Sequence, residues 1–136
     1  MRRGSIALLL GLSVFLQMQL LAPAVASTRA TMILIVGERH GEYPTIQSAI
    51  DASIDGDSVL ISSGTWQETI NLRGKSITLA PLDGEVTINA MRRGTVITCV
   101  SGEDTNTIIE GLIIRGGLAD RGAGLLTRNS TPIFRN

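Results

Sequence analysis

Short runs of alternating apolar residues, separated by glycine-containing turns, recur from Asp57 to the end of the chain and restrict the fold more than any other feature. Alternation with a period of two places every second side chain on the same face of a strand. Of residues 27–136, 33 are Ile, Val or Thr, which suit the pleated surface of a sheet. We therefore predict short strands around Val59/Ile61, Ile70/Leu72, Ile77/Leu79, Val86/Ile88, Val96 to Val100, Ile108/Ile109, Leu112/Ile114, Leu125 and Ile133.

The interval between these runs favours a solenoid. Ile77-Thr78-Leu79 recurs as Ile97-Thr98-Cys99, and the pair Val59/Ile61 precedes Ile77/Leu79 by nearly the same interval. A repeat of roughly 20 residues is typical of stacked coils, whereas a sandwich or hairpin barrel favours longer strands joined by two-residue turns. We predict an all-β fold, a parallel β-helix of some four coils, in which each coil pairs with the next.

One helix is predicted before the coils begin. Residues 32–36 form an apolar run typical of a first strand, and residues 45–54 have helical periodicity with Thr45 as the N-cap and Asp55-Gly56 as a left-handed exit. We expect this short helix to cover the open end of the first coil. Its predicted apolar face consists of Ile46, Ala49, Ile50 and Ile54.

The two ends of the sequence lead to two further expectations. Residues 1–26 resemble a signal peptide, with Arg2 and Arg3 before an apolar run and Ala24-Val25-Ala26 as the cleavage motif. We expect cleavage after Ala26, which makes residues 27–136 a secreted, periplasmic or cell-surface domain with no integral membrane span. The apolar run Thr131-Pro132-Ile133-Phe134 has no polar cap after it, so we also expect the β-helix to be truncated at its C-terminal end, with further coils of a longer chain as its partner.

Charge and cysteine content exclude several function classes. The chain has 12 Lys and Arg, 12 Asp and Glu, and one Cys. A zero formal charge lacks the basic patch that nucleic-acid binding needs. A single Cys cannot form an internal disulfide, and no second Cys or His-rich tract completes a zinc site. We expect no cofactor and no metal.

One segment carries a family resemblance. Its residues are Tyr43-Pro44-Thr45-Ile46-Gln47-Ser48-Ala49-Ile50, then Gly56-Asp57-Ser58-Val59, then Gly64-Thr65-Trp66-Gln67-Glu68-Thr69-Ile70, then Gly74-Lys75-Ser76-Ile77-Thr78-Leu79. This pattern resembles the opening of pectin-lyase-like right-handed β-helix proteins, which include pectinesterases, NosD-like periplasmic proteins and bacterial surface proteins. Thr107 to Gly117 resembles a later coil of the bacterial proteins. The resemblance implies a single-stranded right-handed β-helix with an N-terminal capping helix, and it does not choose an activity.

No catalytic residues are predicted. The carboxylate pair, arginine and glutamine donors of a pectinesterase have no match here, and no paired-Asp motif or His-containing loop of a lyase or polygalacturonase is present. We interpret Gln47 and Gln67 as structural. His40 lies in a charged linker and is expected at the surface, and Cys99 is expected to be a small buried apolar residue.

Several acidic, amide and aromatic residues have structural interpretations. Asp55 and Asp57 flank Gly56, as calcium ligands can, but a helix end and a strand start at a solvated corner account for them. Glu103-Asp104 is interpreted as a hydrated turn. Trp66 is expected to pack under the helix, and with Tyr43 and Phe134 it forms no sugar-stacking platform. Four asparagines are expected to stack as an internal amide ladder: Asn71, Asn89, Asn106 and Asn129, the last of which also begins a glycosylation sequon.

Three functions remain open. The first is a non-catalytic exported scaffold that presents a flat sheet face to polysaccharide or another surface component. The second is the N-terminal part of a carbohydrate-active enzyme, an esterase or a lyase, whose catalytic coils lie beyond Asn136. The third is a periplasmic accessory protein of the NosD type.

Overall fold

Three parallel sheets make up the part of the chain that the computed structural model describes, which is residues 29–37 and 42–136. Sheet A has five strands in the order β1-β2-β5-β8-β11, sheet B has the order β3-β6-β9, and sheet C has the order β10-β7-β4. The expected signal peptide and His40 lie outside the described residues. The elements are β1 (Ile33–Val36), α2 (Ile46–Ala52), β2 (Ser58–Ile61), β3 (Gly64–Trp66), β4 (Ile70–Asn71), β5 (Thr78–Pro81), β6 (Val86–Asn89), β7 (Ile97–Cys99), β8 (Ile108–Glu110), β9 (Leu112–Arg115), β10 (Leu125–Thr127) and β11 (Ile133–Arg135).

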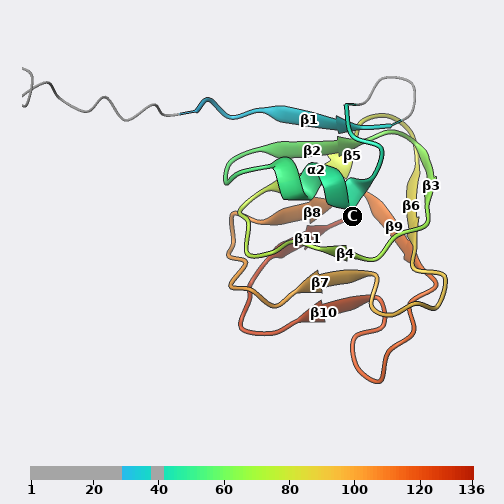
Figure 1. Ribbon diagram of the computed structural model, residues 1–136. Helices are drawn as coiled ribbons and strands as arrows, with labels where there is room; N and C mark the ends of the chain where they lie inside the picture. Colours follow the sequence, from blue (N-terminus) through green and yellow to red (C-terminus); the bar gives the residue numbers. More distant parts are fainter. Residues whose placement is uncertain (1–28, 38–41) are drawn as a thin grey trace, which may run out of the picture. The chain divides into compact units, whose positions relative to one another are not determined.

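The chain visits the three sheets in turn and forms a β-solenoid of about four turns. Strands β2, β3 and β4 form one circuit, β5, β6 and β7 the next, and β8, β9 and β10 the third, after which β11 returns to sheet A. All pairings between these strands are parallel. Figure 1 shows the strands stacked along one axis. The predicted solenoid with one short helix near its N-terminal end is confirmed.

The circuits are unequal in length, and most are longer than the repeat in the sequence suggests. Ser58 pairs with Thr78, which matches the predicted interval. The interval is longer where Ile70 pairs with Ile97, and longer again where Thr78 pairs with Ile108. The similarity between Ile77-Thr78-Leu79 and Ile97-Thr98-Cys99 was therefore wrong as a guide to stacking, because β5 lies in sheet A and β7 in sheet C. The same alternation recurs on each sheet, so a match in sequence can join strands of different sheets.

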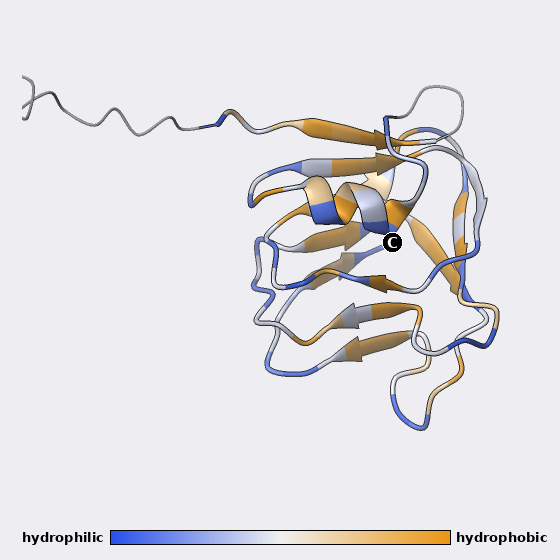
Figure 2. Ribbon diagram, viewed as in Figure 1, coloured by the Kyte–Doolittle hydropathy of each residue, from blue (hydrophilic) through white to orange (hydrophobic). Residues whose placement is uncertain are grey.

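The core runs along the inside of the solenoid as ladders of equivalent residues. In sheet A, Leu34, Val59, Leu79 and Ile109 occupy successive rungs and are at most 3% exposed. Figure 2 shows apolar colour along the strands and polar colour in most of the turns. Because inward residues stack directly on one another between circuits, the core continues through all of the circuits in the described unit of residues 31–136.

The helix α2 begins as predicted and ends earlier. Thr45 is the N-cap, with its hydroxyl accepting a hydrogen bond from the Ser48 amide at 3.1 Å and the Ser48 hydroxyl accepting one from the Thr45 amide. Ile46, Ala49 and Ile50 are buried, which confirms most of the predicted face. Ile54 was wrongly included, since the backbone becomes extended at Ser53 and Ile54 is 41% exposed.

Two charged side chains hold α2 against the first circuit. The Glu68 carboxylate accepts hydrogen bonds from the amides of Ile46 and Gln47 at 2.9 and 3.1 Å, at the positive end of the helix. At the other end, the Lys75 ammonium donates to the carbonyls of Ile50, Asp51 and Ser53 at 2.5–2.8 Å. Both ends of the helix are therefore capped by the circuit on which it lies.

Gln47 joins the same helix to the edge of sheet C. Its side-chain oxygen accepts a hydrogen bond from the Asn71 amide at 2.8 Å, and its side-chain nitrogen donates to the Asn71 carbonyl at 3.2 Å. A glutamine amide here supplies the donor and acceptor that a neighbouring strand would offer to β4. The expected structural role of Gln47 is confirmed, and α2 contacts β1, β2 and β4.

Candidate functional site

The outer face of sheet C carries a polar hollow of about 320 Å³. Strand β4, strand β7 and the turn that precedes β7 form it. The hollow is lined by Thr69, Ile70, Asn71, Arg93, Gly94, Thr95 and Thr98.

Strand alternation places the polar groups of this hollow outside the solenoid. Ile70 and Ile97 pair with each other and are at most 1% exposed, so they face inward. The next pair along the same strands, Asn71 and Thr98, faces the opposite way because successive side chains alternate. A hydroxyl and an amide from adjacent circuits thus lie side by side on the surface.

Two residues of the hollow are held in place by the backbone around them. Asn71 accepts a hydrogen bond from the Arg73 amide on its side-chain oxygen at 2.8 Å, which leaves its amide N–H₂ group available to a ligand. The Arg93 guanidinium donates to the Gln67 carbonyl at 3.2 Å, which ties it to the preceding circuit. Guanidinium has five N–H donors, so further donors remain for a bound oxygen.

The chemistry of this hollow suits binding by hydrogen bonds. Three threonine hydroxyls can donate and accept, while Arg93 and Asn71 supply N–H donors. The lining contains no carboxylate, histidine or thiol that could act as a base or nucleophile beside these hydroxyls. A ligand rich in oxygen atoms, such as a carbohydrate, has the complementary groups.

A second hollow of about 530 Å³ lies at the corner between sheets C and A, and its acidic residues are already engaged. Asp55 accepts a hydrogen bond from the Ser76 amide at 2.8 Å. Asp57 accepts from the amides of Met32 and Ile54 at 2.8 and 2.9 Å and is 1% exposed. The prediction that Asp57 starts a strand at a solvated corner was therefore wrong about solvation. The described residues contain no cluster of His, Cys, Asp or Glu suited to a metal ion.

Glu103 was predicted to lie in a hydrated acidic turn, and this prediction was wrong because the residue is buried. It is 1% exposed, and its carboxylate accepts hydrogen bonds from the Gly74 amide, the Ser101 amide and the Ser130 hydroxyl at 2.7–2.9 Å. Burial alone would raise the pKa of the Glu103 carboxyl, but these hydrogen bonds together outweigh it and hold the pKa below its ordinary value. The donors come from turns of three successive circuits, so Glu103 joins those circuits.

Its neighbour Asp104 matches the prediction of an exposed turn residue. The Asn106 amide donates to its carboxylate at 2.9 Å and the Ser76 hydroxyl at 3.0 Å. These hydrogen bonds, led by that of the Asn106 amide, lower the pKa of Asp104. The acidic pair therefore divides into one buried and one solvated carboxylate.

Cys99 is buried, as predicted, and its thiol has no disulfide partner among the described residues. Burial, with a smaller contribution from the charge of Glu103, raises the pKa of Cys99 to about 12. The thiol therefore stays protonated at neutral pH, which removes the thiolate that a cysteine nucleophile needs.

The expected asparagine ladder is wrong. Asn71 lies in sheet C beside Thr98, whereas Asn89 lies in sheet B beside Arg115. Each of these two asparagines instead accepts a hydrogen bond from the amide two residues later, a local turn that asparagine favours. Asn106 and Asn129 lie in other turns, and Asn129 is exposed with φ of 52°.

The aromatic residues are dispersed, as expected. Trp66 and Tyr43 are partly buried against the core. Trp66 lies in strand β3, and its indole N–H donates to the Ser62 carbonyl at 3.0 Å. The helix α2 mainly contacts β1, β2 and β4, so Trp66 does not lie on one of the strands that the helix mainly contacts. Gln67 is exposed in the turn of the first circuit, and its carbonyl receives Arg93. Phe134 is 39% exposed at the far end of the solenoid.

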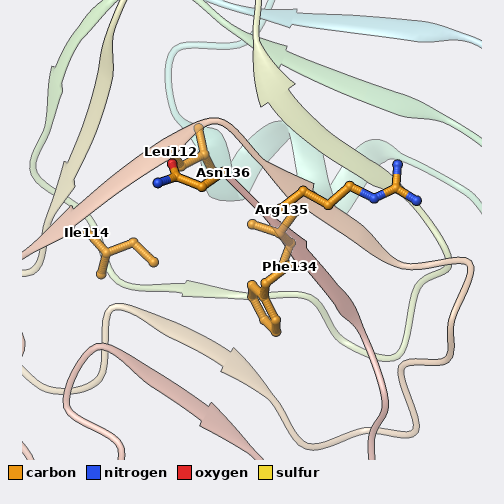
Figure 3. A pocket seen from close by; sticks show the side chains of 6 residues that line it. Leu112, Ile114, Phe134, Arg135 and Asn136 are labelled. Carbon is orange, nitrogen blue, oxygen red and sulfur yellow. The ribbon is translucent and has the colours of Figure 1, made fainter.

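That far end carries a third, apolar hollow of about 280 Å³. Ile109, Leu112, Ile114, Phe134, Arg135 and Asn136 line it. Figure 3 shows Phe134 and Ile114 on facing segments around this space. The last circuit thus leaves its core side chains partly uncovered.

The residues of the polar hollow were not predicted as a site. Thr69 and Thr98 lie far apart in the sequence, and both line the hollow because β4 pairs with β7 in the observed register. A usable signal was the polar residue next to each inward isoleucine, in Ile70-Asn71 and Ile97-Thr98. Because the circuits differ in length, the sequence did not indicate that these two pairs lie side by side.

In comparisons with known proteins, no family model, no curated protein and no solved structure matches the chain. Within the described residues, the structure contains no helix with the length and apolar character needed to cross a membrane.

Proposed function

We propose that this chain is an exported, non-catalytic β-solenoid segment that binds polysaccharide, or another oxygen-rich surface component, on the outer face of sheet C. The observation that carries the proposal is the polar hollow, in which hydroxyl, amide and guanidinium groups from adjacent circuits converge. Repeated circuits present such groups at a spacing of about 4.8 Å, which suits a ligand that is itself an extended chain.

Two further parts of the proposal rest on sequence patterns. The leader of residues 1–26 supports export with cleavage after Ala26. The segment from Tyr43 to Leu79 supports membership of the pectin-lyase-like group, and the structure explains part of its pattern, since Glu68 and Lys75 are the residues that cap α2.

Binding to a panel of plant and bacterial polysaccharides tests this function. We expect Arg93→Ala and Thr98→Val each to weaken binding at least tenfold, measured by titration calorimetry, because each removes a donor from the hollow. The matched control is Thr87→Val, which removes a threonine hydroxyl from the middle of β6 in sheet B. Binding that survives both hollow variants, or binding by no member of the panel, would refute the proposal.

A second candidate is that these circuits are the N-terminal part of a pectinesterase-like or pectate-lyase-like enzyme. The partly uncovered core around Phe134 favours it, because further coils of the same kind could stack there. The coding sequence after codon 136 separates the two candidates. Two carboxylates and an arginine on adjacent further coils would favour the second, and further glycine-rich repeats without them would favour the first.

A further inference from the structure

The corner at which the chain passes from sheet B to sheet C exposes apolar side chains beside arginines. This surface, here called the B–C corner, consists of residues 90–96, between β6 and β7, and residues 115–124, from the end of β9 to β10. Met91 in the first turn is 48% exposed, and Leu118 in the second is 52% exposed. Figure 1 shows both turns at the lower right of the solenoid.

Backbone hydrogen bonds join the two turns into one surface. The Arg92 amide donates to the Gly116 carbonyl at 2.7 Å, and the Leu118 amide donates to the Gly94 carbonyl at 3.0 Å. Met91 and Arg92 have φ of 51° and 61°, a left-handed conformation that is uncommon for residues with a side chain. Both side chains are exposed, so this turn keeps an apolar and a cationic group in solvent.

The fold concentrates positive charge at the B–C corner. Arg92, Arg93, Arg115 and Arg121 lie there, with Asp120 as the one acidic residue. Residues 27–136 contain ten Lys and Arg and twelve Asp and Glu in total. Within the described part of the chain, none of these four arginines forms an ion pair with a carboxylate. The zero formal charge of the whole sequence therefore averages a basic corner with an acidic remainder.

Arginines around exposed aliphatic side chains are complementary to an anionic lipid surface. Guanidinium groups are attracted to anionic headgroups, while neighbouring apolar side chains enter the boundary with the acyl chains. A polysaccharide or a nucleic acid also offers anionic groups, but it has no apolar phase for Met91 and Leu118. Surfaces for single-stranded nucleic acids also use aromatic side chains to stack bases, and residues 90–96 and 115–124 include none.

We propose that the B–C corner binds the surface of a bilayer that contains anionic phospholipid. Met91 and Leu118 enter the headgroup region, and the surrounding arginines contact lipid phosphates. The corner lies on the flank of the solenoid, where the turns point away from its axis. This inference is independent of the proposed polysaccharide site. Arg93 borders both surfaces, so the tests below substitute Arg92 and Arg121 instead.

A polarity-sensitive fluorophore tests whether position 118 enters lipid. We expect nitrobenzoxadiazole on the Leu118→Cys full chain to brighten at least twofold with vesicles of equal parts phosphatidylglycerol and phosphatidylcholine, and not with phosphatidylcholine alone. Cys99 is buried and its pKa is raised to about 12, so labelling at neutral pH is confined to the new thiol. Leu82→Cys is the matched control, since Leu82 is 37% exposed in the turn after β5.

The position of the label separates this contact from membrane binding elsewhere in the chain. Association through another segment, including residues 1–26, would not distinguish position 118 from position 82. No response at 118, equal responses at the two positions, or an equal response to phosphatidylcholine alone would each overturn the proposal.

Paired charge substitutions test the arginines. In the labelled Leu118→Cys chain, Arg92→Gln with Arg121→Gln should raise the lipid concentration for half-maximal response at least tenfold, from about fivefold per charge. Arg73→Gln with Arg128→Gln removes two exposed arginines from the corner between sheets C and A and should have less than a third of that effect. Equal losses in both variants would overturn the proposal. Binding of dextran sulfate without a vesicle response at 118 would also overturn it, in favour of a soluble polyanion.

Discussion

At the scale of single residues, Glu103 is the clearest case of a charged group with a structural role. Its carboxylate is almost fully buried and receives donors from the turns at Gly74, Ser101 and Ser130. Gly74 has φ of +76°, and a side chain there would meet the Ser101 carbonyl oxygen at 2.6 Å. At the corner between sheets C and A, the lack of a side chain at Gly74 leaves room for the Ser101 carbonyl, and the Gly74 amide donates a hydrogen bond to the Glu103 carboxylate.

Substituting Glu103 should change both stability and its dependence on pH. The pKa of Glu103 is lowered in the folded protein, so its contribution is present above the pKa of the unfolded chain and is lost as the pH falls through the folded pKa. We expect Glu103→Gln to reduce the free energy of unfolding by about 2 kcal/mol at pH 7, the scale of hydrogen bonds to a charged group. The reduction should shrink below pH 4. Urea unfolding at pH 7 and at pH 3.5 measures both values.

Glu85→Gln is the control for this measurement, because Glu85 is an exposed glutamate in a turn of the same solenoid. It should change the free energy of unfolding by less than about 0.5 kcal/mol at either pH, as is usual for surface positions. Equal effects of the two substitutions at pH 7 would contradict the role assigned to Glu103.

At the scale of elements, α2 shows how a seven-residue helix is maintained by tertiary contacts. Isolated helices of this length are unstable in water, but here Glu68 caps one end, Lys75 caps the other, and Gln47 bonds to β4. The existence of the helix and its N-cap could be predicted from the spacing of Thr45, Ile46 and Ile50. The C-terminal end of the helix could not be predicted from this spacing, because it is set by the change to an extended backbone conformation at Ser53.

Removing Lys75 should weaken the attachment of α2 more than removing a neighbouring surface cation. We expect Lys75→Met to lower the free energy of unfolding by about 2 kcal/mol, because three helix carbonyls lose a charged donor. Arg73→Met removes an exposed ion pair with Asp51, worth well under about 1 kcal/mol. Urea unfolding gives both values, and hydrogen exchange should localise the Lys75 effect to residues 46–53. A larger loss in the Arg73 variant would contradict this account.

At the scale of the whole molecule, alternation and turn residues were enough to predict a solenoid but not its register. The pattern at Ile77 and at Ile97 is the same, yet these residues belong to different sheets. The circuits differ in length and share no fixed period, because the turns vary much more in length than the strands do. The polar hollow depends on that register, and it could not be located from sequence for the same reason.

The open end of the solenoid should be the least protected part of its backbone. We expect amides of β9, β10 and β11 to exchange with solvent at least tenfold faster than those of β2 and β5, which have strands on both sides. Hydrogen exchange followed by mass spectrometry measures this difference. Uniform exchange along the axis would contradict the prediction.

The way in which α2 is attached has a consequence for solenoids of other lengths. Glu68, Lys75 and Asn71 all belong to the first circuit or to the turn that follows it, and no later circuit contributes a bond to the helix among those described. Adding or deleting later circuits would therefore leave this terminus chemically unchanged. Residues 43–75 therefore contain all the described side-chain hydrogen bonds that fix the helix, so arrays with different numbers of circuits could share this terminus.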